Sequence, residues 1–316
     1  MIIEDIGEIN SKIELLTPQS HENVAIIPLK TVRNYNLDIL TLKKGMELNL
    51  VEVKECETST VNTLIVKNKA VTPLILIDGN EVIGGDQNRI VNSTILIAPQ
   101  SESKIPVSCT ERGRWAYKSE FQESEYLADF NTRRVKAHAM HAKRSPQHEI
   151  WSSINNLELR RGFSSPTSAM HESYENQKAD LNEMMESFEI VDGQNGVLVI
   201  VNGEIKGFEL FLNPEIYKEF HAKVLKSYLV GDDVKTTAFT INVDEARQVI
   251  DDAMNSSFES KPNNGLEKAY KFENSQGLGD LYIYENEIIH WSYFKNENDE
   301  TSDDEMVEDV ELKTDI

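Results

Sequence analysis

Six short runs rich in valine, isoleucine and leucine fill most of residues 23–111, and they constrain the fold more than any other feature of the sequence. The runs are NVAIIPLK, MELNLVEV, TVNTLIV, VTPLILIDG, TILIAP and IPVSC. Several alternate apolar with polar residues, and turn residues separate them, as in consecutive β-strands. Residues 1–125 are therefore predicted to be β-rich. LTLKKGMELNLVEV, with its Lys-Lys-Gly turn, is predicted to form a hairpin.

The periodicity becomes helical after Trp115. Residues 133–143 have a helical pattern, and Ser-Pro pairs follow at 145–146 and 165–166. A serine N-cap followed by proline at the first helical position is a frequent start of a helix. The second pair predicts a long helix of about twenty residues with one apolar stripe. Residues 126–192 are thus predicted to be a helical middle segment.

Strands return near residue 195, now mixed with helices. NGVLVIVNGEIKGFELF predicts a hairpin with an Asn-Gly turn, and NPEIYKEFHAKVLKSYL begins with an Asn-Pro helix start. GLGDLYIYENEIIHWSYF predicts a final hairpin. Residues 193–295 are therefore expected to mix strands and helices. The 316 residues suffice for a sizeable core, and we expect an α+β protein in which residues 1–295 form one large domain.

The charge distribution separates the C-terminal end from the rest of the chain. Residues 296–316 contain ten acids and one lysine, and the remaining residues carry −13 of the total net charge of −22. The terminal stretch is predicted to be a disordered acidic tail. The acidic remainder argues against general binding to nucleic acids or to anionic membranes.

The start of the chain and the two cysteines indicate a cytoplasmic location. The first residues, MIIEDIGEINSKIELL, are acidic where a secretory signal would be basic, and no apolar run is long enough to span a bilayer. Two cysteines, Cys56 and Cys109, do not make a disulfide framework. We therefore expect a reduced, cytoplasmic protein.

The segment GNEVIGGDQNR at 79–89 is the first candidate for a site. Glycines such as Gly84 and Gly85 allow a ligand to approach the backbone closely. The four polar residues that can contact a ligand are Glu81, as general base or metal ligand, Gln87 and Asn88, as neutral hydrogen-bonding groups, and Arg89, as a phosphate or carboxylate fork. The spacing fits neither a dinucleotide-binding fingerprint nor a P-loop. A bulged hairpin with solvated polar residues is the alternative.

A second polar block, CTERGRW, follows the strand IPVSC. Its candidates are Glu111 as acid or base, Arg114 as an anion clamp and Trp115 as a stacking surface, with Cys109 and Arg112 as further candidates. Cys109 would be a nucleophile only with a base beside it, and a buried cysteine is the commoner outcome. An exposed turn with a surface ion pair and a core tryptophan is the alternative for the whole block.

Residues 133–161 are the cationic region of this acidic chain, with a net charge of +5. They are expected either to form a solvated face or to form a wall that attracts phosphate beside Arg89 and Arg114. His138 and His141 lie three residues apart, but no third ligand has the spacing of a zinc site, so no metal is predicted.

The two polar blocks resemble those of the ARG and Rhodanese-Phosphatase-superfamily-Associated Protein family, with QHEIW at 147–151 as a further likeness. The matching residues are Glu81, Gln87, Asn88, Arg89, Cys109, Glu111, Gly113, Arg114 and Trp115, here called the motif residues. One departure is Asn80, which stands between Gly79 and Glu81 where the family pattern has Gly-Glu directly. The resemblance covers about residues 20–295. It implies a role near ADP-ribosylglycohydrolases and rhodanese-like phosphatases, which is an association and not a mechanism.

Three functions follow as hypotheses. In the first, an enzyme processes an ADP-ribose-like or other phosphorylated nucleoside ligand, with Glu81 or Glu111 catalytic, Gln87 and Asn88 orienting it, Arg89 and Arg114 on phosphate, and Trp115 stacking. The second is a nucleotide-binding sensor or accessory module without turnover, with ADP-ribosylglycohydrolase-type partners by association. The third is a structural partner protein whose motif residues only hold the fold. The sequence does not identify a cofactor, and it allows but does not require a divalent metal on the carboxylates. Carboxylates engaged by arginines would favour binding over catalysis.

Overall fold

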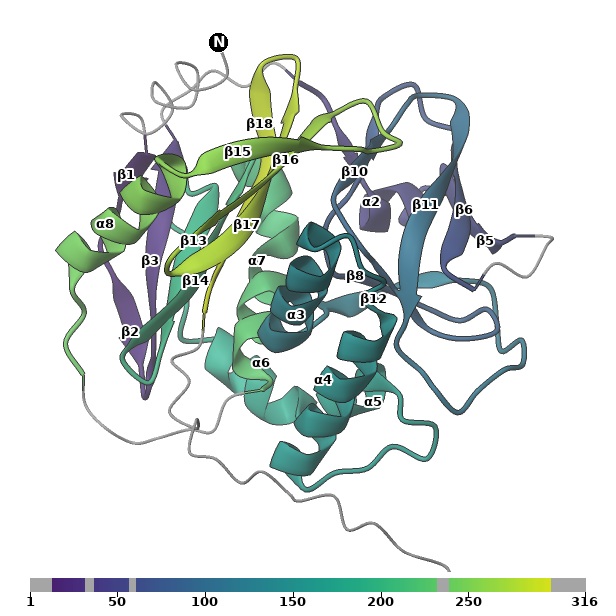
Figure 1. Cartoon of the computed structure of the whole chain (residues 1–316), viewed down its shortest axis with the longest axis horizontal. Coiled ribbons are helices and arrows are strands. Elements are labelled where there is room, and N and C mark those ends of the chain that lie inside the picture. The colour runs from purple at the N-terminus through teal and green to yellow at the C-terminus, as the bar shows by residue number, and fades with distance from the viewer. Residues whose placement is uncertain (1–12, 32–36, 57–60, 232–238, 297–316) are drawn as a thin grey trace, which may run out of the picture.

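A computed structural model describes residues 13–31, 37–56, 61–231 and 239–296 of the chain (Figure 1). The predicted acidic tail, apart from Asn296, lies outside the described residues. Within these ranges the chain forms seven helices and eighteen strands in three sheets, which confirms the α+β class. The β-rich first part, the helical middle and the mixed last part follow one another in the predicted order.

The largest sheet combines the start of the chain with its last third. Its nine antiparallel strands have the order β1-β3-β13-β14-β18-β17-β16-β15, with β2 also paired to β3. The strands are β1 (Ile13–Leu15), β2 (Gln19–His21), β3 (Val24–Thr31), β13 (Gly196–Val201), β14 (Glu204–Phe211), β15 (Ser257–Lys261), β16 (Lys268–Asn274), β17 (Gly277–Tyr284) and β18 (Glu287–Lys295). The predicted Asn-Gly hairpin is β13–β14, and the predicted final hairpin is β17–β18.

Two smaller sheets come from the β-rich first part. A six-stranded antiparallel sheet has the order β12-β8-β9-β11-β6-β5, and a three-stranded sheet has the order β10-β7-β4. The strands are β4 (Leu40–Thr41), β5 (Val51–Glu55), β6 (Thr63–Asn68), β7 (Leu74–Leu76), β8 (Asn80–Ile83), β9 (Arg89–Val91), β10 (Ile95–Ile97), β11 (Ser101–Cys109) and β12 (Gln122–Leu127). The pair β4–β7 is parallel.

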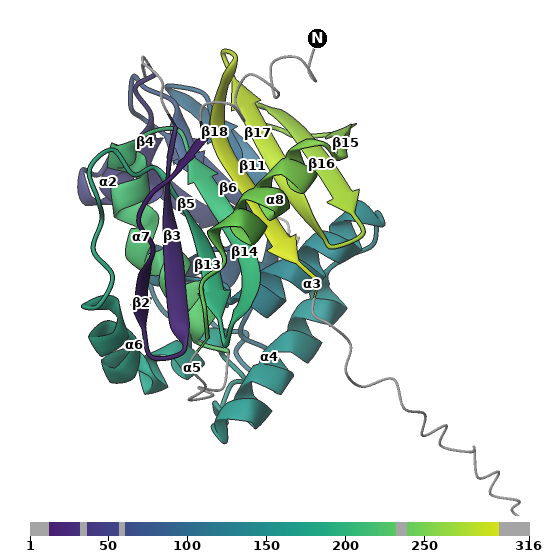
Figure 2. The ribbon, with the colours of Figure 1, turned by 90° about the vertical axis from the view of Figure 1, so that its left-hand side faces the viewer.

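Helices cover these sheets on several sides. They are α2 (Leu42–Glu47), α3 (Phe130–His141), α4 (Gln147–Arg161), α5 (Met170–Asn176), α6 (Lys178–Met185), α7 (Pro214–Leu229) and α8 (Val243–Met254). Asn213 caps α7 by accepting a hydrogen bond from the backbone N–H of Ile216, as its Asn-Pro start predicted. Helices α7 and α8 lie on opposite sides of the large sheet (Figure 2).

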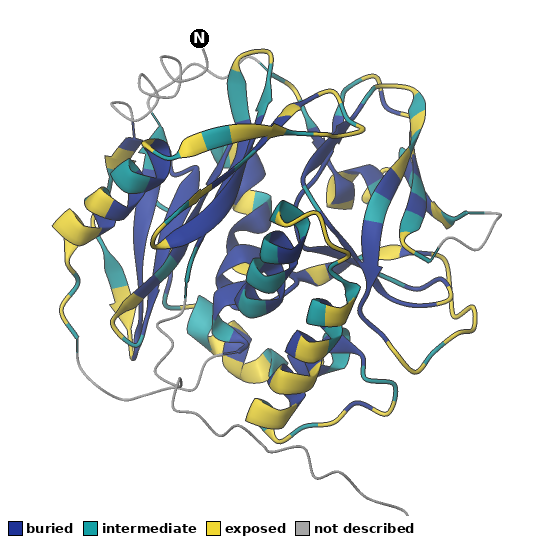
Figure 3. Ribbon diagram, in the orientation of Figure 1, coloured by how far each residue is buried: buried dark blue, intermediate teal, exposed yellow. Residues whose placement is uncertain are grey.

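The central strands of the large sheet are buried (Figure 3). The alternation of their side chains between the two faces explains this layered packing. Val197, Val199 and Val201 of β13 pack in one buried cluster with α7, whereas Leu198 and Ile200 pack in another with α8. Successive side chains of a strand point to opposite faces, so a continuous apolar run such as GVLVIV needs a cover on both. The six-stranded sheet, the three-stranded sheet and α2 share a further buried core, which includes Val66, Val91 and Val107.

Three local predictions were wrong. Pro146 and not Ser145 occupies the N-cap of α4, and no side chain caps this helix. The Lys-Lys-Gly segment forms helix α2 and not a hairpin turn, because the Thr41 hydroxyl caps it at the backbone N–H of Lys44. The predicted long helix after Ser165 is two short helices, α5 and α6, which meet at Gln177. Ser165 accepts hydrogen bonds from the backbone N–H groups of Thr167 and Ala169, and so it stabilises a loop before α5.

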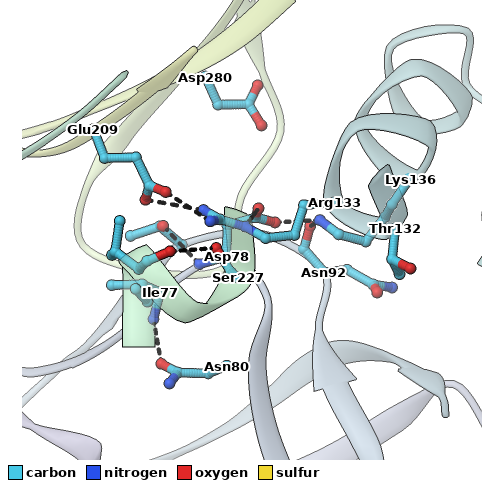
Figure 4. A network of polar contacts seen from close by, with 12 residues as sticks. Ile77, Asp78, Asn80, Asn92, Thr132, Arg133, Lys136, Glu209, Ser227 and Asp280 are labelled. Carbon is cyan, nitrogen blue, oxygen red and sulfur yellow. Dashed lines mark hydrogen bonds and ion pairs between the residues drawn. The ribbon is translucent and has the colours of Figure 1, made fainter. Parts of the chain in front are cut away.

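Neither expectation for the cationic region, a solvated face or a phosphate-attracting wall, holds for Arg133 and Lys136 of α3, because both are fully buried. Figure 4 shows them close to Glu209 and Asp78. Arg133 pairs with Glu209 of β14 at 2.7 Å and with Asp78 at 3.2 Å. Lys136 pairs with Asp78 and donates to the carbonyl of Asn92. A buried charge requires such partners, and these charges therefore join α3, the large sheet and the turn before β8.

Candidate functional site

The two motif blocks lie next to each other at the tip of the six-stranded sheet. Residues 79–89 form β8, a tight turn and the start of β9, and Cys109 ends β11, which pairs with β9. Gly84 and Gly85 in the turn have φ values of 122° and 52°. A Cβ on Gly84 would lie 2.5 Å from the carbonyl oxygen of Glu120. The glycines are therefore required by loop–loop contact as well as by the backbone conformation.

Arg114 fastens the second block to this glycine turn. Its partners are the carbonyls of Gly84 (3.1 Å), Gly85 (2.7 Å) and Ala116 (2.9 Å), Oδ1 of Asn88 (3.1 Å) and the Glu111 carboxylate (2.6 Å). A guanidinium is the side chain that can serve so many acceptors at once. The ion pair lowers the pKa of Glu111 despite the burial that opposes it. Arg114 thus acts as a latch between two loops.

The central motif residues are engaged in the same way. Gln87 donates to the backbone carbonyl of Glu111 at 2.8 Å and accepts from Arg89 at 3.1 Å. The backbone N–H of Asn88 donates a hydrogen bond to the Glu111 carboxylate at 3.3 Å. Arg89 is 2% exposed and also lies 3.8 Å from Glu55. The motif residues at 87–89 therefore bind one another and the backbone of the second block, beneath the surface.

The structure places Glu81 on the other face of the sheet from Arg89. In the β8–β9 pairing Glu81 is opposite Ile90, and Val82 is opposite Arg89. Residues directly opposite in an antiparallel pair share a face, and neighbours along a strand do not. Glu81 therefore points with Ile90 towards helices α4 and α5, whose side chains pack around Ile90. Arg89 points with Val82 and Cys109 to the opposite face.

Glu81 contacts a residue that the sequence analysis did not consider, His171 in the first turn of α5. Its Oε2 lies 2.9 Å from Nδ1 of His171, and Oγ of Ser124 in β12 lies 3.4 Å from the same nitrogen. Glu81 is completely buried, while the His171 side chain is 21% exposed. Burial lowers the pKa of His171, but the Glu81 carboxylate outweighs it, and the net pKa is raised. Ninety residues separate the two, so no local spacing could have indicated the pair.

The remaining candidates divide between core and surface. Cys109 is buried, which raises the pKa of its thiol, and its backbone N–H and C=O both bond to the amide of Gln147 at 2.9 Å. Trp115 is 65% exposed and Arg112 is exposed, on the loop that Arg114 holds. A buried thiol is a poor nucleophile, whereas an exposed tryptophan is available for contact.

A groove of about 990 Å³ runs beside the latched loops. Its walls are the two edge strands of the six-stranded sheet, β5 and β12, together with α2, Lys223 of α7, the turn at 85–86 and residues 117–121. Seven carboxylates and four lysines line it, so its net charge is negative. Of the predicted site residues Gly85 alone lines this groove among the described residues.

Glu123 and Lys223 form a buried ion pair at this groove, 2.9 Å apart. Asn80, the residue that departs from the family pattern, also donates to Glu123 at 2.8 Å. Desolvation raises the pKa of Glu123, and the second oxygen of its carboxylate has no hydrogen-bond partner in the described part of the chain. No group of three His, Cys, Asp or Glu residues suited to a metal ion occurs in that part either.

Comparison with models of known protein families identifies the family of this chain. The model of the ARG and Rhodanese-Phosphatase-superfamily-associated Protein domain matches residues 12–294. The chain belongs to this family. The family name links it to ADP-ribosylglycohydrolases and to the rhodanese-phosphatase superfamily, and that association fits an accessory role. The search of curated proteins gave no match, and neither did the search of solved structures. No helix in the described ranges is long and apolar enough to cross a membrane.

Proposed function

We propose that this protein is a ligand-binding accessory of an ADP-ribose-related system and that its groove takes a ribose-containing nucleotide. The observation behind this proposal is that the motif residues hold the loops that border the groove. Arg114 bonds to the carbonyls of Gly84 and Gly85, and the groove is lined by Gly85, Asp86 and the loop from Tyr117. The role of the motif residues is then to shape a binding groove without contacting the ligand.

The chemistry of the lining suits a sugar and a base. Carboxylates such as Asp86 and Glu120 can accept hydrogen bonds from ribose hydroxyls, as acidic residues do in dinucleotide sites. Tyr117, which is 68% exposed, offers a ring on which a base can stack. In this arrangement groove lysines such as Lys43 bind the phosphates, because Arg89 and Arg114 are already bonded to other residues of the protein. The groove volume is at the upper end of ordinary ligand sites.

The state of the two motif carboxylates favours binding over two-carboxylate catalysis. Glu111 is paired with Arg114 at 2.6 Å, and Glu81 is completely buried with its carboxylate 2.9 Å from His171. A catalytic pair needs both groups within reach of one substrate. We therefore assign Glu111 a structural role, as the carboxylate that pairs with Arg114 and helps it to join the two loops.

Calorimetry with ADP-ribose, NAD, ATP and inorganic phosphate tests the proposal, together with thermal unfolding. We expect ADP-ribose or NAD to bind and to raise the Tm, and phosphate alone to have a much smaller effect. Tyr117→Ala should weaken binding by about 1–3 kcal/mol, the usual contribution of one stacked base. Leu159→Ala is the matched control, because Leu159 is 78% exposed on α4, outside the groove lining. No binding of any nucleotide at millimolar concentration would exclude the proposal.

A further inference from the structure

The pair Glu81–His171 has the construction of an acid–base centre. The carboxylate comes from a central strand, is completely buried and points one oxygen at Nδ1 of the imidazole. The other oxygen of Glu81 is buried without a hydrogen-bond partner among the described residues. The Tyr126 ring packs edge-on against His171, with centroids 5.7 Å apart, and limits the orientation of the imidazole. Because the Glu81 carboxylate binds Nδ1 of His171, Nε2 of this partly exposed imidazole is left to exchange protons with a substrate or water.

We propose that His171, held and polarised by Glu81, is a general acid–base residue that hydrolyses a carboxylic ester. This inference goes beyond the ribose-ligand function and does not depend on it. Ser124 connects the two regions, because it lines the groove and its hydroxyl is 3.4 Å from Nδ1 of His171. A substrate bound in the groove would therefore lie one residue away from the pair.

Geometry selects water and not Ser124 as the nucleophile. A serine nucleophile gives its proton to one imidazole nitrogen while a carboxylate holds the other. Here Ser124 and Glu81 share Nδ1, and the Ser124 hydroxyl also accepts from the backbone N–H of Tyr126 at 3.1 Å. Nε2 has no protein partner among the described residues, so it can bind a water molecule.

The surrounding charges select a neutral reacting group. Glu81 and Glu175 both favour the protonated imidazole, and Lys118 is the cation that opposes them. Glu175 is itself bonded to Tyr126 and Lys178. Lys178 offsets the charge of Glu175, but Glu81 has no cationic partner other than His171 among the described residues, so its buried charge would repel the anionic phosphorus centre of a phosphodiester. A carboxylic ester carries no charge at the carbonyl carbon.

The reaction balances with water alone. The oxygen of water attacks the ester carbonyl carbon while Nε2 of His171 takes a proton from that water. The tetrahedral intermediate then breaks its C–O bond to the alcohol portion, and the leaving oxygen receives the proton back from His171. The products are one carboxylic acid and one alcohol. Glu81 stabilises the imidazolium that exists between the two transfers.

Hydrolysis of p-nitrophenyl acetate by the full chain tests the proposal. His171→Asn keeps a donor near the position of Nδ1 and removes the acid–base nitrogen, so the variant should still fold at the assay pH and lower kcat/KM about a hundredfold or more. His148→Asn is the matched control, because His148 is an exposed histidine on α4. It should stay within about twofold of the wild type, since surface substitutions away from a site change little.

Glu81→Gln separates catalysis from a merely structural role and serves also if His171→Asn does not fold. Without the carboxylate, the pKa of His171 falls, and the rise of the rate with pH should move to lower pH while kcat drops about tenfold or more. An unmoved pH profile would overturn the proposal. So would wild-type turnover no faster than free imidazole at the same concentration, or faster cleavage of bis(p-nitrophenyl) phosphate than of the acetate.

Discussion

The guanidinium of Arg133 donates to both carboxylate oxygens of Glu209, at 2.7 and 3.0 Å, and both side chains are completely buried. Asp78 and His290 complete the group, at 3.2 Å from Arg133 and Glu209 respectively. Coulomb attraction from Arg133 holds the pKa of Glu209 at about 2 against desolvation. Buried ion pairs therefore join the helical middle segment to the large sheet. Water cannot solvate either charge if its partner is removed, because both side chains are inaccessible.

Arg133→Met should destabilise the protein strongly. It removes the arginine that pairs with the buried Glu209 and one of the two cationic partners of Asp78, which keeps Lys136, and a loss of about 3–5 kcal/mol is expected. Arg144→Met is the control, because Arg144 pairs with Glu149 at 2.6 Å but is 62% exposed. That exposed pair should contribute less than about 1 kcal/mol. Urea unfolding of both variants measures the difference, and equal losses would contradict a special role for the buried pair.

Arg114→Lys should act on stability before it acts on any ligand. Lysine cannot reproduce a fork that serves three carbonyls, an amide and a carboxylate. We expect a loss of about 1.5–3 kcal/mol in unfolding free energy, while nucleotide affinity of the folded protein changes little. Arg112→Lys, on the exposed neighbour, is the control. Lower affinity with unchanged stability would instead place Arg114 on the ligand.

The His171–Glu81 pair should make stability depend on pH near neutrality. The folded pKa of His171 is raised, so its charged-state contribution is fully present below the unfolded pKa and is lost as pH rises through the folded pKa. Glu81 of β8, Glu175 of α5 and Lys118 of the adjoining loop set this shift. The difference in unfolding free energy between wild type and His171→Asn should therefore be larger at pH 5.5 than at pH 8.5. These two values lie below and above the ordinary histidine pKa of about 6.5. Urea unfolding at both values measures it, and a constant gap would assign the pair a neutral hydrogen bond only.

Cys109 should be unreactive in the folded protein. Burial raises the pKa of its thiol, so little thiolate is present and reagent cannot reach it. Cys56 is the internal control, because it is half-buried near the end of β5. Ellman's reagent should label Cys56 rapidly and Cys109 only after unfolding. Fast labelling of Cys109 in a Cys56→Ser variant would restore it as a candidate nucleophile.

The strand pattern and the start of α7 were predictable because local rules dominate there, whereas the two Ser-Pro pairs do not cap helices. Asn213 and Pro214 begin α7 as expected, and the Asn-Gly turn joins β13 to β14. Helix α2 was missed although Thr41 is a local N-cap, because the glycine of its Lys-Lys-Gly segment is typical of a turn. A Cβ on Gly45 would meet Val51, so this glycine serves close packing and not a turn.

The candidate site was predictable in part. The two motif blocks do lie together, and Glu111 and Arg114 are paired there. The partner of Glu81 was not predictable, because strand register and the path of α5 bring His171 to it from ninety residues away. The sequence shows that Glu81 and Arg89 lie near one turn, but not that the pairing of Glu81 with Ile90 sends them to opposite faces.

The two edges of strand β3 pair with strands that the ribosome synthesises at very different times. Its N-terminal neighbours β1 and β2 precede it, but its other edge pairs with β13, at Ile27 opposite Leu198. At ordinary translation speed the ribosome needs on the order of ten seconds or more to supply that partner. Through this interval the nascent chain keeps an apolar strand edge open to other chains, so the folding yield in a cell depends on how well that edge is shielded until residue 201 has emerged.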